Sequence, residues 1–239
     1  MEHLTEPSSR WTRERRWDIP PASPGLGNGA LHVWRADLDA SPADADGLLD
    51  GAERARAATI LDARRRHRWS HARATLRSLL AGYLGMEPRD VGVECTPGGK
   101  PGVSTGDPGS RLFFNVSHSG PLALYAFTRA GEVGIDVELP RARTADLAAL
   151  AGRVFGEAEG RRLRALHEQL RESEFLRGWV RHEALLKLSG GRADGPAPSA
   201  WLVELEPGGD AAAAVALGRA PAEVCCWEWL PGGALPHDC

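Results

Sequence analysis

The six residues Val-Gly-Ile-Asp-Val-Glu at positions 133–138 constrain the fold of this chain more than any other stretch. Their apolar residues occupy every second position, which predicts a strand with one buried face. Asp136 and Glu138 are also two apart, so their side chains project together from the opposite face. Neighbouring carboxylates repel unless a cation lies between them, and Mg²⁺ or Mn²⁺ binds such oxygens. Alternatively, both acids lie on a solvated strand face.

A helix predicted over residues 172–189 adds a third acid to this pattern. Trp179, Glu183 and Lys187 recur every four residues, so they share one stripe of the helix. Glu183 followed by Lys187 is the favourable order for an ordinary surface ion pair, but beside apolar residues it also suits a partly buried site. Of the 29 Lys and Arg residues only two are lysines, Lys100 and Lys187, which suggests that these positions need a compact ammonium group.

Polar and basic segments upstream offer contacts for an anion. Residues 111–128 predict a hairpin whose first strand runs into a Ser-His-Ser turn, suited to holding an anion or merely satisfied by local hydrogen bonds. Ser117 and His118 do not favour a hydrolase, because adjacent residues of an extended chain point to opposite faces. A helix rich in arginine is predicted over residues 50–84, and Lys100 follows on a Gly-Gly turn. Each of these basic residues is either solvated or a phosphate contact.

Composition limits the class of protein. The chain has 239 residues and 42% hydrophobic content, which is typical of a soluble globular protein of one or two domains. Its net charge is −3, so no overall basic charge indicates nucleic-acid binding. No apolar run approaches the roughly 20 residues of a membrane span, and no signal-peptide core is present. The four cysteines lack CxxC spacing. We therefore expect a cytoplasmic protein.

The other segments predict strands around these helices. We expect a first strand over residues 31–38, and strands 201–205 and 223–229 that complete a second sheet. Residues 211–222 are alanine-rich and are either strand or loop. A further helix is expected over residues 156–171.

Five motifs in this order resemble the 4′-phosphopantetheinyl transferases of the surfactin-synthetase-associated type. The matching residues are 99–101, 114–119, 133–138, 154–159 and 179–187. The resemblance implies an α+β fold of two pseudo-symmetric α/β halves, each a small sheet packed with a long helix, with the ligand cleft between them. The expected parts are a flexible arm (1–28), an N-terminal half (29–131), a C-terminal half with the metal site (132–230) and a tail (231–239).

The resemblance also implies a reaction. The phosphopantetheine arm of coenzyme A would pass to a serine of a carrier protein, releasing adenosine 3′,5′-bisphosphate. Asp136, Glu138 and Glu183 would hold Mg²⁺ on the pyrophosphate, Glu183 would act as base, and Lys187 would stabilise the leaving group. The expected contacts to the coenzyme phosphates are Arg56, Arg68, Lys100, Ser117, His118, His182 and Lys187.

His182 departs from the family pattern, in which many members have a lysine before the helix glutamate. A histidine with its ordinary pKa of about 6.5 is mostly neutral at pH 7, so a phosphate contact by His182 requires a local shift or help from Arg181. We predict that His182→Lys keeps or raises the affinity for coenzyme A above pH 7.

Two other classes of function stay open on the sequence alone. One is a different metal-dependent phosphoryl enzyme, such as a phosphatase or nuclease, and the other is a non-catalytic coenzyme A-binding module. For a transferase, the expected clients are acidic acyl or peptidyl carrier proteins of polyketide or nonribosomal peptide synthesis. Arg161, Arg162 and Arg164 would then contact the carrier or be solvated, and the enzyme is expected to be a monomer.

Overall fold

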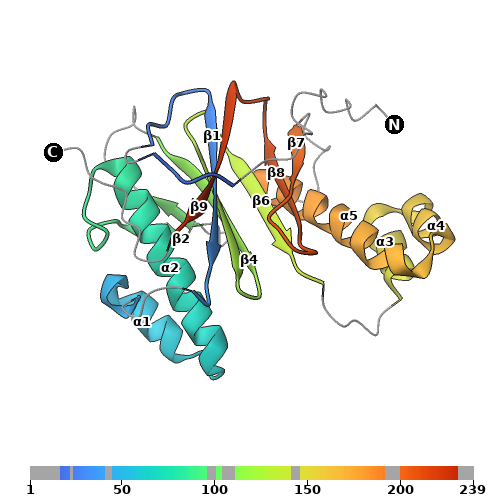
Figure 1. The fold of residues 1–239 in the computed structure, drawn as a ribbon, viewed down its shortest axis with the longest axis horizontal. Helices are drawn as coiled ribbons and strands as arrows, with labels where there is room; N and C mark the ends of the chain where they lie inside the picture. The colour runs from blue at the N-terminus through green and yellow to red at the C-terminus, as the bar shows by residue number, and fades with distance from the viewer. Residues whose placement is uncertain are drawn as a thin grey trace.

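The computed structural model describes residues 17–21, 24–40, 45–95, 101–103, 111–140, 146–191 and 200–230. The strands are β1 (Ala30–Asp37), β2 (Val93–Cys95), β3 (Pro101–Val103), β4 (Phe113–Ser119), β5 (Leu122–Thr128), β6 (Val133–Glu138), β7 (Trp201–Leu205), β8 (Ala212–Leu217) and β9 (Glu223–Trp229). The helices are η1 (Asp46–Leu48, a 3₁₀ turn), α1 (Gly51–Ala58), α2 (Ala63–Leu84), α3 (Leu147–Phe155), α4 (Glu157–Ala165) and α5 (Glu168–Leu188). The predicted α+β class is confirmed (Figure 1).

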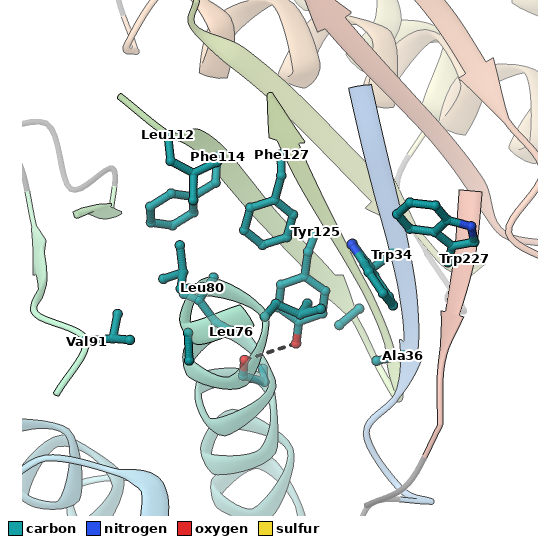
Figure 2. Packing of buried hydrophobic residues seen from close by; sticks show 14 of the residues in the cluster. Trp34, Ala36, Leu76, Leu80, Val91, Leu112, Phe114, Tyr125, Phe127 and Trp227 are labelled. Carbon is teal, nitrogen blue, oxygen red and sulfur yellow. Dashed lines mark hydrogen bonds between the residues drawn. The ribbon is translucent and has the colours of Figure 1, made fainter. Parts of the chain in front are cut away.

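The first half of the molecule is a sheet covered by one long helix. Its strand order is β4-β5-β1-β9, and α2 lies across one face. Figure 2 shows Leu76 and Leu80 of α2 pointing at Tyr125 and Phe127 of β5, within one buried cluster. The Tyr125 hydroxyl donates to the carbonyl oxygen of Ala72 at 3.0 Å, so its one polar atom is satisfied inside this core.

The helix predicted over residues 50–84 is in fact two helices. Asp50 caps the start of α1, where it accepts from the backbone N–H of Glu53. Asp62 caps the start of α2 in the same way, accepting from Arg65 N–H at 2.7 Å. A second N-cap aspartate inside an apparently continuous helical pattern begins a new helix, which explains the break.

The second half is a sheet of order β6-β8-β7 packed against α5. In Figure 1, α3 and α4 lie beside the N-terminal part of α5, away from the first sheet. The alanine-rich segment is the central strand β8, whose buried alanines, among them Ala214 and Ala216, leave room for α5. Gly190 follows α5 with φ +70°, which glycine adopts without steric cost.

The two halves are joined by polar side chains as well as by apolar packing. β6 is an edge strand of its sheet, and alternate β4 side chains accept hydrogen bonds from backbone N–H groups of β6 and of Leu139, the residue after it. The pairs are Asn115 with Ile135 (3.0 Å), Ser117 with Val137 (3.4 Å) and Ser119 with Leu139 (3.1 Å). These contacts satisfy the edge without a continuous backbone ladder, because hydroxyl and amide oxygens take the place of strand carbonyls.

The expectation that residues 223–229 complete the second sheet is wrong. These residues form β9, which pairs in parallel with β1 of the first sheet. Trp227 of β9 packs against Trp34 of β1, with ring centroids 5.0 Å apart, and burying these indoles on the first sheet explains the crossover. The predicted arm up to residue 16 and the tail 231–239 lie outside the described residues.

Candidate active site

Asp136 is the centre of the site that the sequence predicted. Asp136 is only 5% exposed, because α5 covers this face of β6. Its Oδ1 accepts from the Ser117 hydroxyl at 2.8 Å and from the Lys187 ammonium at 2.7 Å. Lys187 also donates to the carbonyl oxygen of Ile135 at 3.0 Å. The solvated-face alternative is therefore wrong for Asp136, which is buried and paired.

Gly134 lets α5 come close enough to make this contact. A Cβ atom at Gly134 would stand 2.0 Å from the carbonyl oxygen of Ala184 and 2.6 Å from the backbone nitrogen of Leu188. The helix backbone therefore lies directly on the strand, which only glycine permits. Lys187, next to Leu188 on α5, is thereby brought against the strand at Asp136.

The second oxygen of Asp136 has no hydrogen-bond partner among the described residues, although it is buried. A buried acceptor without a partner is costly, and such atoms in native proteins commonly face a ligand or an ion. Mg²⁺ prefers carboxylate oxygens, so this oxygen of Asp136 is chemically suited to a divalent cation.

The three predicted metal ligands are arranged as follows. Glu138 accepts from the Ser119 hydroxyl at 2.8 Å, next to Asp136 along β6. Glu183 is partly buried on α5, one turn before Lys187. The described residues contain no group of three or more His, Cys, Asp or Glu side chains gathered closely enough to hold a metal ion. The ligand set of Asp136, Glu138 and Glu183 therefore stays a prediction.

Ser117 and His118 lie in strand β4, and the expected Ser-His-Ser turn is wrong. The turn follows at Gly120, whose φ of +57° suits glycine. The strand continues through Ser119, which pairs with Leu122 of β5. The hydroxyls of Ser117 and Ser119 donate to carboxylates of β6. Ser117 thus faces Asp136, whereas His118 is exposed.

The predicted phosphate contacts of the N-terminal half lie in different settings. Arg68 forms a two-pronged ion pair with Asp39, with both nitrogen–oxygen distances 2.7 Å. Arg68, and with it Arg64, holds the pKa of the Asp39 carboxyl well below its usual range. Arg56 is exposed on α1, 3.5 Å from the Thr59 hydroxyl. Lys100 lies outside the described residues.

His182 on α5 is partly buried and packs edge-on against Phe155, with ring centroids 5.7 Å apart. The structure thus places this imidazole against an apolar side chain. Its role as a phosphate contact stays a prediction.

Comparison with known proteins identifies the family of this chain. Residues 132–234 match the family model of the 4′-phosphopantetheinyl transferase superfamily. The chain is 37% identical over 180 residues to the 4′-phosphopantetheinyl transferase HetI of Nostoc sp., a match that covers 74% of this chain and 76% of HetI. This chain belongs to the 4′-phosphopantetheinyl transferase superfamily. The predicted superfamily and enzyme class, transfer of phosphopantetheine to carrier proteins, are confirmed. The surfactin-synthetase-associated type stays a prediction.

Other transferases of the superfamily match shorter parts of the chain. The 4′-phosphopantetheinyl transferase AcpT of Salmonella typhi is 39% identical over 95 residues, which cover 40% of this chain and 47% of AcpT. AcpT of Escherichia coli (strain K12) is 37% identical over 129 residues, covering 54% of this chain and 60% of that protein. The family match begins just before β6 and includes α5, so it contains Asp136 and Lys187.

The arginines that the transferase was expected to offer to a carrier protein lie on α4. Arg162 pairs with Glu159 at 2.7 Å and with Glu174 of α5 at 3.0 Å. Arg161 pairs with Glu157 at 3.3 Å, and Arg164 is exposed. The carrier contact by Arg161, Arg162 and Arg164 stays a prediction, but Arg162 is largely occupied within the protein.

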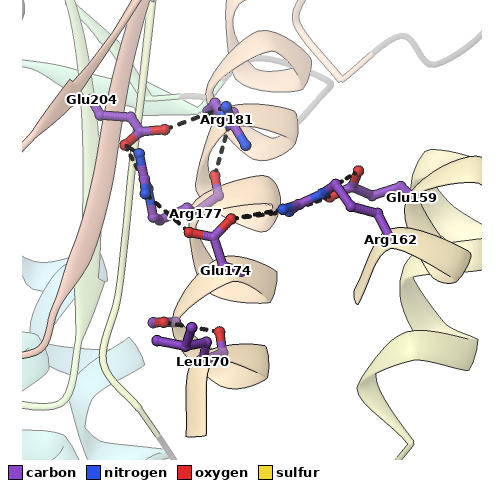
Figure 3. A network of polar contacts seen from close by, with 8 residues as sticks. Glu159, Arg162, Leu170, Glu174, Arg177, Arg181 and Glu204 are labelled. Carbon is purple, nitrogen blue, oxygen red and sulfur yellow. Dashed lines mark hydrogen bonds and ion pairs between the residues drawn. The ribbon is translucent and has the colours of Figure 1, made fainter. Parts of the chain in front are cut away.

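Figure 3 shows that Arg162, between Glu159 and Glu174, belongs to a longer ionic network. Glu174 also pairs with Arg177 at 3.0 Å, and Glu204 of β7 pairs with Arg177 at 2.8 Å and with Arg181 at 3.4 Å. The network connects α4, α5 and β7 and so fixes the helix that bears Glu183 and Lys187. All of its members are partly exposed, so each pair contributes little to stability on its own.

The sequence interpretation missed three polar side chains that contact strand β6 or a predicted site residue. Asn115 and Ser119 continue the polar alternation of Ser117 on one face of β4, and all three side chains are buried, which indicates that polar partners face them. Nothing in the sequence distinguished Asp39 as a partner of Arg68, because an acidic residue after a strand is common.

No helix in the described part of the chain is both long and apolar enough to cross a membrane.

Proposed function

We propose that this transferase moves the 4′-phosphopantetheine arm of coenzyme A to a serine of an acyl or peptidyl carrier protein in a Mg²⁺-dependent reaction that releases adenosine 3′,5′-bisphosphate. The observation that carries the proposal is Asp136. One of its oxygens is held by Ser117 and Lys187, and the other is buried without a partner among the described residues. A cation and a pyrophosphate would complete this arrangement.

Each of the proposed catalytic residues has a separate role in the reaction. Asp136, Glu138 and Glu183 would hold Mg²⁺, which when bound supplies neutralisation of charge on the pyrophosphate. Glu183 accepts the proton of the carrier serine, directly or through a water molecule. Lys187, already fixed between Ile135 and Asp136, offers its ammonium to the pyrophosphate and stabilises the leaving group.

The remaining phosphates of coenzyme A need cations and hydrogen-bond donors. The proposed contacts are Arg56, Arg68, Lys100, Ser117, His118 and His182. Ser117 also donates to Asp136, so it connects this set to the metal ligands.

The client and setting of the enzyme belong to the same proposal. Carrier proteins of polyketide or nonribosomal peptide synthesis are the proposed clients, with contacts at Arg161, Arg162 and Arg164. The enzyme is proposed to act in the cytoplasm as a monomer.

The direct test is the intact mass of an apo carrier protein after incubation with the transferase, coenzyme A and Mg²⁺. We expect a gain of one phosphopantetheine arm on the carrier, and loss of the gain in the presence of EDTA. An unmodified carrier together with release of inorganic phosphate would instead indicate hydrolysis. A panel of apo carrier domains, compared by modification rate, identifies the client.

A further inference from the structure

We propose that Asp39 is a positioning residue, which orients Arg68 toward the 3′-phosphate of coenzyme A and so makes the enzyme prefer coenzyme A to dephospho-coenzyme A. The inference rests on the proposed function, because it assumes that coenzyme A is the donor. It adds to that function a role for Asp39 and a preference for the donor that carries a 3′-phosphate.

Arg68 and Asp39 form a bidentate ion pair, in which two guanidinium nitrogens bond to the two carboxylate oxygens. The Nε and Nη2 atoms of Arg68 each lie 2.7 Å from an oxygen of Asp39. The Nη2 of Arg64 lies 2.7 Å from the same Oδ2. The Arg68 side chain is 18% exposed, whereas that of Arg64 is 71% exposed, so Arg68 is the constrained member of the cluster.

A bidentate ion pair of this kind fixes the whole plane of a guanidinium, since its five N–H donors are rigidly connected. Asp39 engages the edge that carries Nε and Nη2. The Nη1 group of Arg68 is then directed elsewhere, and it has no acceptor among the residues that the structure describes. A donor that is both oriented and available is suited to an incoming anion.

The available Nη1 group lies beside the turn between β4 and β5. It is 4.0 Å from the place where a Cβ atom at Gly120 would stand, and the Leu139 side chain is 2.9 Å from the same place. Ser119, which precedes Gly120, donates to Glu138 at 2.8 Å. Arg68 therefore borders the end of β6, next to one of the proposed metal ligands.

The position of Arg68 selects one phosphate of the coenzyme. The pyrophosphate is proposed at Asp136 and Lys187. Leu139, beside Arg68, is three residues further along the chain, which corresponds to about 10 Å in extended backbone. The 3′-phosphate is the one that the adenosine ribose separates from the pyrophosphate. A phosphate monoester is also a group to which oriented arginine donors form strong charge-assisted hydrogen bonds.

The experiment measures kcat and KM of transfer with coenzyme A and with dephospho-coenzyme A, which lacks the 3′-phosphate. For Asp39→Asn we expect the KM for coenzyme A to rise ~10-fold, roughly the loss of one charge-assisted contact, with kcat within about 2-fold of the wild type. The KM for dephospho-coenzyme A should stay unchanged. Asp39→Glu, which keeps the carboxylate, should recover part of the preference.

Asp90→Asn is the matched control, because Asp90 is an exposed acid of the same half that has no place in the site. An equal rise of KM for both coenzymes in Asp39→Asn would overturn the proposal, since it indicates a general structural role. Tighter binding of coenzyme A would also overturn it, because Asp39 would then compete with the phosphate. If the wild type transfers from neither coenzyme, the proposed function fails, and calorimetric binding of the two coenzymes to the same variants still tests Asp39.

Discussion

At the scale of single residues, Lys187 is the internal cation of the site. Its ammonium, 2.7 Å from a buried oxygen of Asp136, compensates a carboxylate that has almost no access to water. Such a pair contributes little when intact, but removing one partner leaves an uncompensated charge. In the proposed function, Lys187 and a divalent cation neutralise the same carboxylate.

This arrangement predicts how Lys187→Met responds to metal. The metal-free variant should lose roughly 3 kcal/mol of unfolding free energy, because the Asp136 carboxylate is left unpaired. Mg²⁺ should restore part of the loss, so the Mg²⁺-dependent rise in Tm should be larger than in the wild type. Thermal unfolding without coenzyme checks this, and the double variant Asp136→Asn/Lys187→Met should show no Mg²⁺ response. An equal response of wild type and single variant would contradict it.

A second prediction at this scale concerns His32, which lies in the core of the first half. The Tyr83 hydroxyl accepts from Trp34 Nε1 at 2.8 Å, so its own proton is available for His32 Nδ1, also at 2.8 Å. Burial lowers the pKa of His32 to about 4. The unfolded chain binds a proton below about pH 6.5, whereas the folded protein does so only near pH 4. The contribution of His32 to the free energy of unfolding is therefore fully present above about pH 6.5 and is lost as the pH falls toward 4.

The decrease should reach roughly 3 kcal/mol near pH 4, as 2.5 pKa units imply. Urea unfolding between pH 4.5 and 8 measures it. His32→Gln should be less stable at pH 8 but should show a flatter pH profile, whereas His167→Gln, an exposed change, should follow the wild type. Parallel profiles for wild type and His32→Gln would exclude His32 as the cause.

At the scale of elements, the contact of α5 with β6 depends on Gly134. Gly134→Ala places a methyl group 2.0 Å from a helix carbonyl oxygen, so α5 must move away from the strand. We expect a loss of roughly 3 kcal/mol in unfolding free energy and a loss of transfer activity, because Lys187 moves with the helix. Denaturant unfolding compares it with Gly92→Ala, whose added Cβ meets nothing within 4 Å. Wild-type stability in Gly134→Ala would show that the helix contact is looser than described.

The helices and strands also show which sequence patterns are sufficient to predict secondary structure. Strands β6, β7 and β9 were predicted with their observed bounds, because apolar or aromatic residues alternate between clear turns. β8 gave no signal, since alanine has little strand preference and its burial depends on the helix that covers it. The division between α1 and α2 was signalled by Asp62, but an aspartate within a helix rich in arginine is ambiguous until its cap geometry is seen.

At the scale of the whole molecule, what sequence reasoning could not provide is long-range pairing. The stripe of Glu183 and Lys187 was predicted from spacing, but the contact of Lys187 with Asp136 joins residues 51 positions apart. Likewise, β9 crosses back to β1, a partner that alternation within residues 223–229 cannot specify. The site was recognisable because its residues lie in ordered motifs, whereas its geometry depends on how the two halves meet.

The central claim is that the Asp136 carboxylate between the two halves carries the transfer reaction. Asp136→Asn keeps the shape of the side chain and removes its charge, so single-turnover transfer to an apo carrier protein, followed by intact mass, tests this claim most directly. We predict a loss of ~1,000-fold in rate with the circular dichroism spectrum retained, whereas Asp210→Asn, an exposed control, transfers at the wild-type rate. Transfer by Asp136→Asn within a few-fold of the wild type would contradict the account.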